Sequence, residues 1–323
     1  MGSATQDVFA RTDAETVTIR HGGEKETLLA YPLGTKILIS ELDFQIGGGG
    51  TNTATTFSRQ GLKTGFLGRM GDDDSGKAVL RFLRKERIAF LGAAGGQTGF
   101  SVILDSEEDD RTILTFKGCN DRLRGEEATA GGWSARWLYC SSMLGESYET
   151  MLKTMATVKK AGGAVAFNPS IYQAKRGLGT RQKALSHVDV LILNKEEAAT
   201  LVGHPAGLHD LLRVLAAAGP HTVIVTDGKE GATLFDGERF LSVRPSPEAK
   251  AVETTGAGDA FASGFVAGLA RGLATREALL LGMLNAEAVI GHYGAKERIL
   301  TRKEADALLA AEKRDVKEER PAS

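Results

Sequence analysis

The sequence predicts an α/β protein with a mostly parallel central sheet and helices on both faces of that sheet. Three observations carry this prediction. From Trp137 onward, apolar runs of strand length alternate with segments of helical periodicity. Before that point, segments of alternating polar and apolar residues predict additional strands. At 253–261, a glycine-rich turn leads directly into a helix. Alternating strands and helices are typical of parallel sheets, which bind ligands at the carboxyl ends of their strands.

Length and composition are those of an ordinary globular protein. The chain has 323 residues, of which 42% are hydrophobic, 25% are charged and 40 are glycines. The formal net charge of −1 argues against a nucleic-acid partner, and no apolar run is long enough to span a membrane. No signal peptide is recognisable, and Cys119 and Cys140 lack the spacing of metal ligands. We therefore expect a cytoplasmic protein with two reduced core thiols.

The N-terminal part of the chain predicts strands with one solvent-facing side. Residues 16–19 alternate in polarity, and apolar residues recur at every second position at Leu42, Phe44 and Ile46. Two more strands are expected at 100–104 and 112–116, and the acidic run at 107–110 lies between them. We interpret the acidic run as a solvated hairpin tip rather than a metal site.

The second half of the chain predicts the central sheet and its helices. Strands are expected at 137–140, 165–167, 190–193, 222–225 and 232–235. Helices are expected at 148–160, 195–201, 208–218, 258–270, 276–289 and 303–313. Since the chain shows no internal repeat and no proline-rich linker, we expect one domain over residues 1–313. A charged, frayed tail is expected at 314–323.

The stretch 253–259, Glu-Thr-Thr-Gly-Ala-Gly-Asp, combines an anion site with an acid. A glycine-rich turn that enters a helix leaves backbone N–H groups unpaired, and the helix dipole adds positive potential. We assign the donor role to Gly256, Ala257 and Gly258. Asp259 would be repelled by an anion bound there, but it is explained as a general base for a hydroxyl that attacks a phosphoryl group. An N-cap aspartate beside flexible glycines is the alternative.

A second glycine-rich stretch, Gly-Gly-Gly-Gly-Thr-Asn at 47–52, opens a helical run and is followed by the turn Gly71-Asp72. Together with 253–259, about 200 residues further on, it resembles the two signatures of the ribokinase/PfkB family of sugar and nucleoside kinases. Glu253 replaces the aspartate that begins the second signature in the family. The resemblance covers nearly the whole chain.

The resemblance implies a ribokinase-like three-layer α/β/α fold with a small β-strand lid. The lid would be inserted at about 12–46 and 98–117, and it would cover the sugar and exclude water. A sheet face rich in isoleucine, leucine and phenylalanine would seek cover, so by analogy we expect a homodimer through the lid.

On the substrate side, Asp7, Gly48, Gly49 and Asn52 match the positions at which the family binds sugar hydroxyls. Ribokinase has lysine where this chain has Gly49 and asparagine where it has Thr5. Both departures argue against ribose as the only acceptor to consider.

The turn that carries Asp7 follows the first core strand in the family, whereas here only Met1 precedes it. Two interpretations remain. The first three residues are a cloning remnant and the match is accidental, or the recorded start is internal and a strand is missing upstream. We favour the second, because Asp7, Val8 and Phe9 fit the family pattern as well as Gly2 does.

On the nucleotide side, Asn194 and Glu197 follow a buried strand and match the Asn-x-x-Glu motif that orders Mg²⁺ and the phosphates. Glu197 would act through water, because Mg²⁺ keeps much of its hydration shell. A capped helix explains the same pattern. The turn at 226–231 reads as a hairpin, and in the family it lines the nucleotide site. The nucleotide-binding residues implied are Asn194, Glu197, Thr226, Gly228, Gly231, Thr255 and Asn285. Glu253 would serve a monovalent cation.

The sequence therefore supports an ATP- and Mg²⁺-dependent kinase that phosphorylates a hydroxyl of a small sugar or nucleoside, with ADP as the alternative donor. A kinase of phosphorylated sugars would need pocket cations, for which Arg59, Arg111 and Lys117 are candidates. A non-catalytic sugar or nucleotide sensor on the same fold is another alternative. A dinucleotide-dependent oxidoreductase is disfavoured, since Gly-x-Gly-x-x-Gly after an early strand is lacking.

Overall fold

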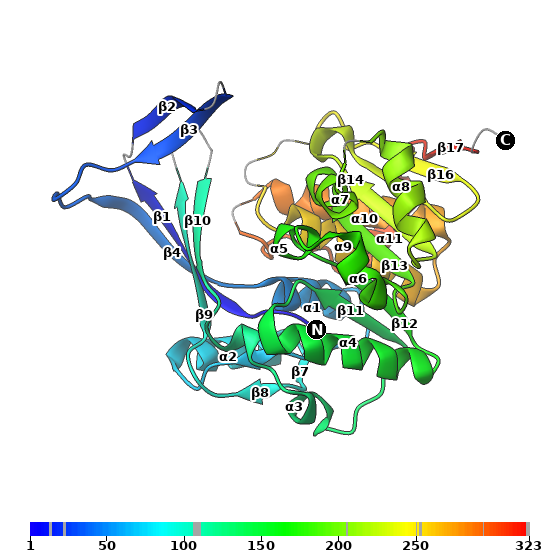
Figure 1. Ribbon diagram of the computed structural model, residues 1–323, viewed down its shortest axis with the longest axis horizontal. Coiled ribbons are helices and arrows are strands. Elements are labelled where there is room, and N and C mark those ends of the chain that lie inside the picture. Colours follow the sequence, from blue (N-terminus) through cyan, green and yellow to red (C-terminus); the bar gives the residue numbers. More distant parts are fainter. Residues whose placement is uncertain are drawn as a thin grey trace.

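The structure is a computed structural model with a body and a lid (Figure 1). It describes residues 1–12, 15–21, 24–105, 111–204, 206–249, 251, 254–292 and 294–320. Within these ranges, no helix is both long and apolar enough to cross a membrane.

The central sheet of the body has seven strands in the order β11-β12-β13-β14-β15-β16-β17. They are β11 (Trp137–Ser141), β12 (Ala164–Asn168), β13 (Val190–Asn194), β14 (Thr222–Thr226), β15 (Ala232–Phe235), β16 (Phe240–Val243) and β17 (Lys317–Glu319). The first four are parallel, and the last three continue the sheet in antiparallel pairs. The five strands predicted from the second half of the sequence are confirmed.

Helices cover both faces of this sheet. Successive side chains along β13, such as those of Leu191 and Ile192, enter different buried clusters, because neighbouring residues of a strand point to opposite faces of the sheet. One cluster includes α4 (Gly145–Lys160), α7 (Lys195–Val202) and α8 (Leu208–Ala217). The other includes α9 (Ala257–Arg271) and α10 (Thr275–Ile290). The three-layer α/β/α prediction is therefore confirmed.

The remaining elements complete the body. The expected helical runs after residue 47 and near residue 303 form α1 (Gly49–Arg59) and α11 (Arg302–Ala311). Several short elements were not predicted: β5 (Gly65–Phe66), β6 (Arg69–Met70), α2 (Asp74–Lys85), β7 (Ala89–Phe90), β8 (Ala93–Ala94), α3 (Gly125–Thr129), α5 (Ile171–Ala174) and α6 (Gly177–Leu185). The α2 helix carries a start signal, because the Asp73 side chain accepts a hydrogen bond from Gly76 N at 2.8 Å.

The lid is a second sheet that projects from the body (Figure 1). Its order is β10-β9-β1-β4, formed by β1 (Thr5–Thr12), β4 (Ile39–Gly47), β9 (Gly99–Asp105) and β10 (Arg111–Phe116). A hairpin of β2 (Glu15–His21) and β3 (Glu24–Ala30) accompanies it. The strands predicted here are present. The acidic run at 107–110 lies outside the described residues.

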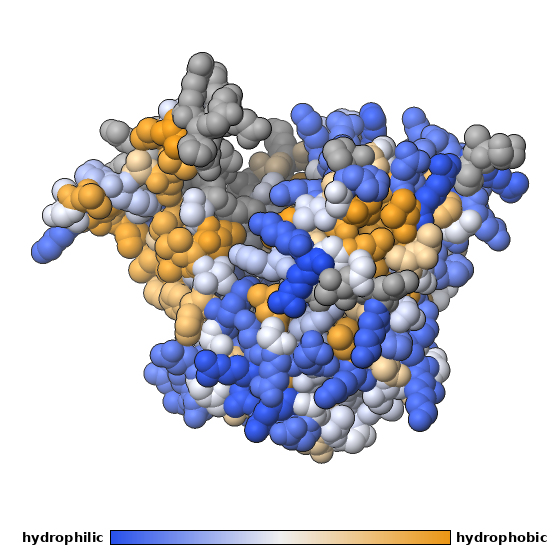
Figure 2. Space-filling model, viewed as in Figure 1, coloured by the Kyte–Doolittle hydropathy of each residue, from blue (hydrophilic) through white to orange (hydrophobic). Residues whose placement is uncertain are grey.

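The lid has the expected solvent-facing side, and the apolar residues of β4 and β10 are exposed as well. Leu42 and Phe44 are 54% and 60% exposed, and Leu114 and Phe116 on β10 are also exposed. Figure 2 shows hydrophobic surface gathered over the lid. The lid projects from the body, and among the described residues no element covers these side chains fully.

The C-terminal tail is more ordered than the sequence predicts. Val316 is almost fully buried, and residues 317–319 form β17, which pairs with β16 at the edge of the central sheet. The expectation of a frayed tail is therefore wrong for residues 316–319. Both cysteines are buried and free, as predicted, and burial raises the pKa of the Cys140 thiol to about 12.

Candidate active site

A cavity of about 300 Å³ lies where the parallel strands end and α9 begins. Four of its lining residues, Ser141, Asn168, Asn194 and Thr226, are the last residues of β11, β12, β13 and β14. Asp259, in the first turn of α9, lines it as well. This is the position at which parallel α/β sheets bind their ligands.

The turn into α9 has the geometry of an anion site. Gly256 adopts a left-handed conformation with φ of +80°, and a Cβ atom there would lie 2.4 Å from Ala295 Cβ. The N–H of Ala257 donates to Thr254 O at 3.2 Å, so the turn itself uses this predicted donor. Within the described chain, the N–H groups of Gly258 and Asp259 have no acceptor. The N–H of Gly256 has no acceptor in this part of the chain either, so two of the three predicted donors, Gly256 and Gly258, are unpaired, and the N–H of Asp259 adds a third.

Asp259 is held by the other glycine-rich segment. Its Oδ2 accepts a hydrogen bond of 2.8 Å from Asn52 Nδ2, although the two residues are 207 positions apart. Gly49 lies beside the carboxylate, since a Cβ atom added at Gly49 would lie 3.4 Å from Asp259 Oδ1. Burial raises the pKa of Asp259, and the hydrogen bond from Asn52 and the charge of Lys296 partly offset that effect. A carboxylate with a raised pKa accepts a proton more readily.

The predicted substrate residues meet around the turn between β4 and α1. The Asp7 carboxylate accepts a hydrogen bond of 2.7 Å from Thr5 Oγ1 and packs against Gly47, where a Cβ atom would collide with it. Gly48 has φ of +94°, and a Cβ there would lie 2.6 Å from Ser3 O. Asn52 Oδ1 is buried without a hydrogen-bond partner within the described structure. Of the four predicted substrate residues, Gly49 lines the cavity, whereas Asp7, Gly48 and Asn52 lie behind its lining.

The Asn-x-x-Glu motif forms a capping box at the start of α7. Asn194 Oδ1 accepts from Glu197 N at 2.8 Å, and Glu197 Oε2 accepts from Asn194 N at 3.0 Å. Both residues also line the cavity. Burial is the largest cause of the raised pKa of Glu197, and the charge of Asp259 contributes to it. The capping interpretation is thus present in the structure, and the Glu197 carboxylate also borders the cavity.

The remaining nucleotide-side residues fall into three groups. Thr226 lines the cavity at the end of β14, and the turn with Gly228 and Gly231 joins β14 to β15 as the predicted hairpin. Thr255 Oγ1 is buried and has no partner among the described residues, which fits a polar ligand. Asn285 is fully buried and bonds to Ala260 O and Leu300 N, so it does not line the cavity. Glu253 lies outside the described residues.

The three candidate cations lie in different surroundings. Lys117 lines the cavity, with Nζ 5.5 Å from the ring centroid of Tyr172. Arg59 instead forms an ion pair with Glu86 at 2.8 Å and donates to Lys296 O, so it serves the interior. The Arg111 side chain is outside what the structure describes.

Sequence reasoning missed several polar residues of the cavity, among them Asn168, Ser142 and Ser170. The Oγ atoms of Ser142 and Ser170 are 2.6 Å apart, and Asn168 Nδ2 donates to Ile192 O at 2.8 Å. Their position just after predicted strands is the signal that was available. Lys296 was also missed, since no motif marks it.

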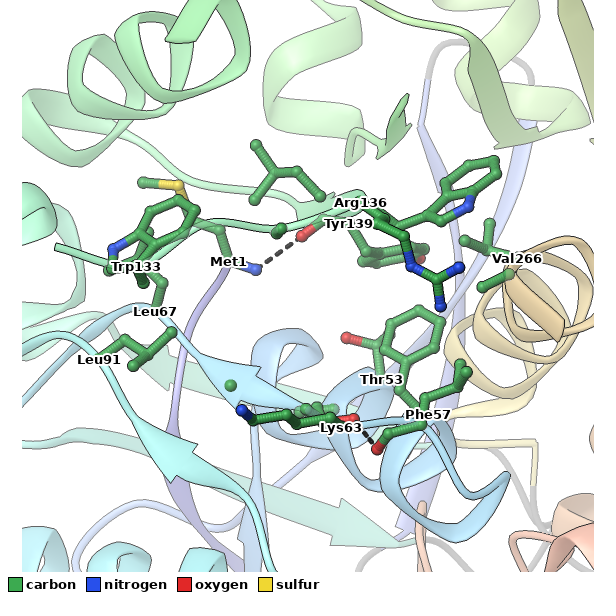
Figure 3. A pocket seen from close by; sticks show the side chains of 18 of the residues that line it. Met1, Thr53, Phe57, Lys63, Leu67, Leu91, Trp133, Arg136, Tyr139 and Val266 are labelled. Atoms are coloured by element: carbon green, nitrogen blue, oxygen red, sulfur yellow. Dashed lines mark hydrogen bonds between the residues drawn. The ribbon is translucent and has the colours of Figure 1, made fainter. Parts of the chain in front are cut away.

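A second cavity, of about 440 Å³, lies between α1, β11 and α9 (Figure 3). Phe57, Trp133 and Tyr139 line it, and Met1 N donates to Tyr139 O at 2.6 Å on one wall. Figure 3 shows the Arg136 side chain pointing into it, and among the described residues that line this cavity none is a carboxylate. Since the first cavity holds the carboxylates and the free N–H groups, we take it as the candidate active site.

Comparison with known proteins agrees with this geometry. The family model described as pfkB family carbohydrate kinase matches residues 18–302. An uncharacterized sugar kinase of Archaeoglobus fulgidus is 30% identical over 245 residues, which cover 74% of this chain and 96% of that protein. A fructokinase of Klebsiella pneumoniae is 31% identical over 237 residues, which cover 69% of this chain and 76% of that protein.

Solved structures show the same fold. Ribokinase from Thermotoga maritima matches with a TM-score of 0.80 at 23% identity, over 96% of this chain and 97% of that chain. The resemblance inferred from the two glycine-rich segments is thereby confirmed. On the family match and these relatives, the chain belongs to the pfkB family of carbohydrate kinases and is an enzyme of that class.

Proposed function

We propose that the chain transfers the γ-phosphoryl group of ATP to a hydroxyl of a small sugar or nucleoside, with Asp259 as the general base. The observation that carries this proposal is the position of Asp259. Its carboxylate lies at the start of α9, beside the N–H groups of Gly258 and Asp259, which have no acceptor among the described residues. Asn52 Nδ2 donates a hydrogen bond of 2.8 Å to this carboxylate. A hydroxyl group beside this carboxylate can lose its proton as it attacks the phosphoryl group.

The N–H groups of Gly258 and Asp259 are the donors for negative charge on the transferred group. They are fixed by the helix before the reaction begins, so no reorganisation is needed when charge develops. Each such donor contributes roughly 10²–10³ in rate, and a general base roughly 10²–10⁴. The rest of the acceleration in phosphoryl transfer comes from positioning.

The donor side of the cavity suits a nucleotide with Mg²⁺. Glu197 would hold the ion through water, with Asn194 fixing the carboxylate, and the buried Thr255 Oγ1 supplies a polar atom that lacks a partner in the described chain. Mg²⁺, when bound, neutralises charge on the β- and γ-phosphates. Thr226, Gly228 and Gly231 lie on the adjacent hairpin and would contact the rest of the nucleotide. We include Glu253 as a ligand for a monovalent cation.

The acceptor side is assigned to Asp7, Gly48, Gly49 and Asn52. The buried Asn52 Oδ1, without a partner in the described part of the chain, supports an acceptor that carries hydroxyl groups. A second candidate is a phosphorylated sugar, and the specific observation in its favour is Lys117. Lys117 borders the cavity, whereas Arg59 does not. The Lys117 ammonium group would attract a second phosphate on the acceptor.

The exposed apolar residues of the lid support a homodimer, because a second copy would remove them from water. Leu42, Phe44, Leu114 and Phe116 are the residues concerned. Sedimentation velocity of the full chain measures this directly, and a monomer at micromolar concentration would contradict it.

The Asp259→Asn variant tests the proposed reaction. ADP release is measured with ATP and Mg²⁺ against neutral sugars, nucleosides and phosphorylated sugars. We expect turnover with one acceptor class, a loss of roughly 10²–10⁴ in kcat for Asp259→Asn, and unchanged nucleotide binding. Asp72→Asn, which alters an exposed carboxylate, is the matched control. An unchanged kcat in Asp259→Asn would exclude the proposed base, and turnover limited to phosphorylated sugars would favour the second candidate.

A further inference from the structure

Lys296 is a buried cation that the proposed reaction does not use. The residue is 7% exposed, and its Nζ donates a hydrogen bond to Ile46 O, one residue before the Gly47-Gly48 turn. The same Nζ lies 5.1 Å from the ring centroid of Phe82. Across the described chain, no carboxylate lies within ion-pair distance of it. A buried charge without a paired partner is costly, so its presence calls for a physical reason.

The backbone around Lys296 connects the two glycine-rich segments of the active site. Ala295 packs against Gly256, where a Cβ atom would lie 2.4 Å from Ala295 Cβ. Arg59 on α1 donates from Nη1 to Lys296 O at 3.0 Å, and the same guanidinium pairs with Glu86. Arg59 thus holds the main chain of Lys296, while the Lys296 side chain reaches Ile46 at the end of β4.

The charged groups around Lys296 include both carboxylates of the proposed site. From β1 it faces Asp7, from α9 Asp259, from the end of α2 Glu86, and from α1 Arg59. Burial lowers the pKa of Lys296 to about 7, against the attraction of the three carboxylates, while Arg59 lowers it further. In the reverse direction, the Lys296 charge lowers the pKa of Asp259. The attraction between the Lys296 ammonium group and Asp259 therefore favours the charged form of both groups.

We propose that Lys296 is a positioning residue whose ammonium group is the shared counter-charge of Asp7 and Asp259, and whose hydrogen bond to Ile46 O holds the β4–α1 turn against α9. Lys296 is not among the described residues that line the cavity. Its effect on the reaction passes through Asp259, whose ionised form it stabilises, and this part of the inference rests on the proposed function. Below the pKa of Asp259 the base carries a proton and turnover falls, so the loss of the counter-charge moves this limit to higher pH.

The first test measures charge coupling without using activity. Protein labelled with [13Cε]lysine is titrated by NMR as the wild type, Lys296→Met and Asp259→Asn. We expect one lysine resonance to titrate near pH 7, to vanish in Lys296→Met, and to titrate at lower pH in Asp259→Asn, because the attracting carboxylate is gone. A resonance that titrates identically in the wild type and Asp259→Asn would overturn the proposal. This arm decides the inference even if no acceptor is turned over.

The second test measures kcat/KM against pH for the wild type and Lys296→Met. We expect the loss of kcat/KM in Lys296→Met to be at least about threefold larger at pH 6 than at pH 8.5, since removal of the counter-charge raises the pKa of Asp259 and reduces its ionised fraction at low pH. Lys77→Met, which removes an exposed lysine paired with Asp74, is the matched control and keeps the wild-type profile. An equal loss at both pH values would indicate a packing role alone and overturn the proposal, and absent turnover in the wild type would instead contradict the proposed kinase reaction.

Discussion

Replacing Gly256 by alanine tests whether the turn into α9 must pass this close to residue 295. Gly256 has φ of +80°, and a Cβ atom there would lie 2.4 Å from Ala295 Cβ and 2.8 Å from its Cα. Gly272, at the other end of the same helix, has φ of +86°, but a Cβ there would meet nothing within 4 Å. The two glycines share the left-handed conformation and differ in crowding, so Gly272→Ala is a matched control.

The expected magnitudes follow from this difference. Both variants place alanine in the left-handed region, which costs roughly 1–2 kcal/mol of folding free energy. Carbon atoms pack at about 3.5–4.0 Å, so the 2.4 Å contact at Gly256 forces the turn to move by roughly 1 Å. Such overpacking adds roughly 1–3 kcal/mol in Gly256→Ala alone. Misplacing catalytic groups by about 1 Å lowers the rate by about 10²-fold.

The assay combines steady-state ADP release with thermal unfolding of the two variants. We expect Gly256→Ala to lower kcat/KM by about 10²-fold and Gly272→Ala to change it by less than about twofold. Both should unfold at lower temperature than the wild type, Gly256→Ala more so, because it carries the added clash. A folded Gly256→Ala enzyme with turnover within about threefold of the wild type would refute the reasoning, as would an equal loss in Gly272→Ala.

Two further predictions concern Asn52 and Glu197. Asn52→Leu removes the 2.8 Å hydrogen bond to Asp259, which stabilises the ionised carboxylate by roughly 1.5–3 kcal/mol, so the acid limb of kcat/KM should move to higher pH by roughly 1–2 pH units. Asn285→Leu, which removes another buried amide, should leave that limb in place. An unmoved limb in Asn52→Leu would contradict the proposed stabilisation of Asp259 by Asn52. In Glu197→Gln, which keeps the helix cap, half-saturation by Mg²⁺ should need about tenfold more metal, whereas exposed Glu196→Gln should behave as the wild type.

Local backbone requirements made part of the site predictable from the sequence. Glycine at 256 and 48 is needed because the chain is left-handed there and passes close to other backbone, and the spacing of Gly256, Gly258 and Asp259 places the acid in the first helical turn. Buried strands are near-continuous apolar runs, which is why the ends of β13 and β14, with Asn194 and Thr226, were located correctly.

Features set by distant neighbours were not predictable in this way. The β17 strand consists of Lys317, Glu318 and Glu319, all exposed, so its sequence resembles a charged tail. It forms because Val316 is anchored in the core and the edge of β16 is open for pairing. Lys296 likewise lacks a local signal, since its burial depends on Arg59, which is 237 positions away, and on the end of β4.

The same distinction separates the parts of the active site that serve the reaction from those that select the acceptor. Gly256 and Asn52 determine where the proposed base, Asp259, and the N–H groups beside it lie, because backbone passes close to Gly256 and Asn52 donates to the Asp259 carboxylate. Lys117 and Lys296 add positive charge around that framework through side chains that the backbone does not require. In the proposed reaction, charge at Lys117 is therefore where this chain can differ in acceptor, and charge at Lys296 is where it can differ in pH range.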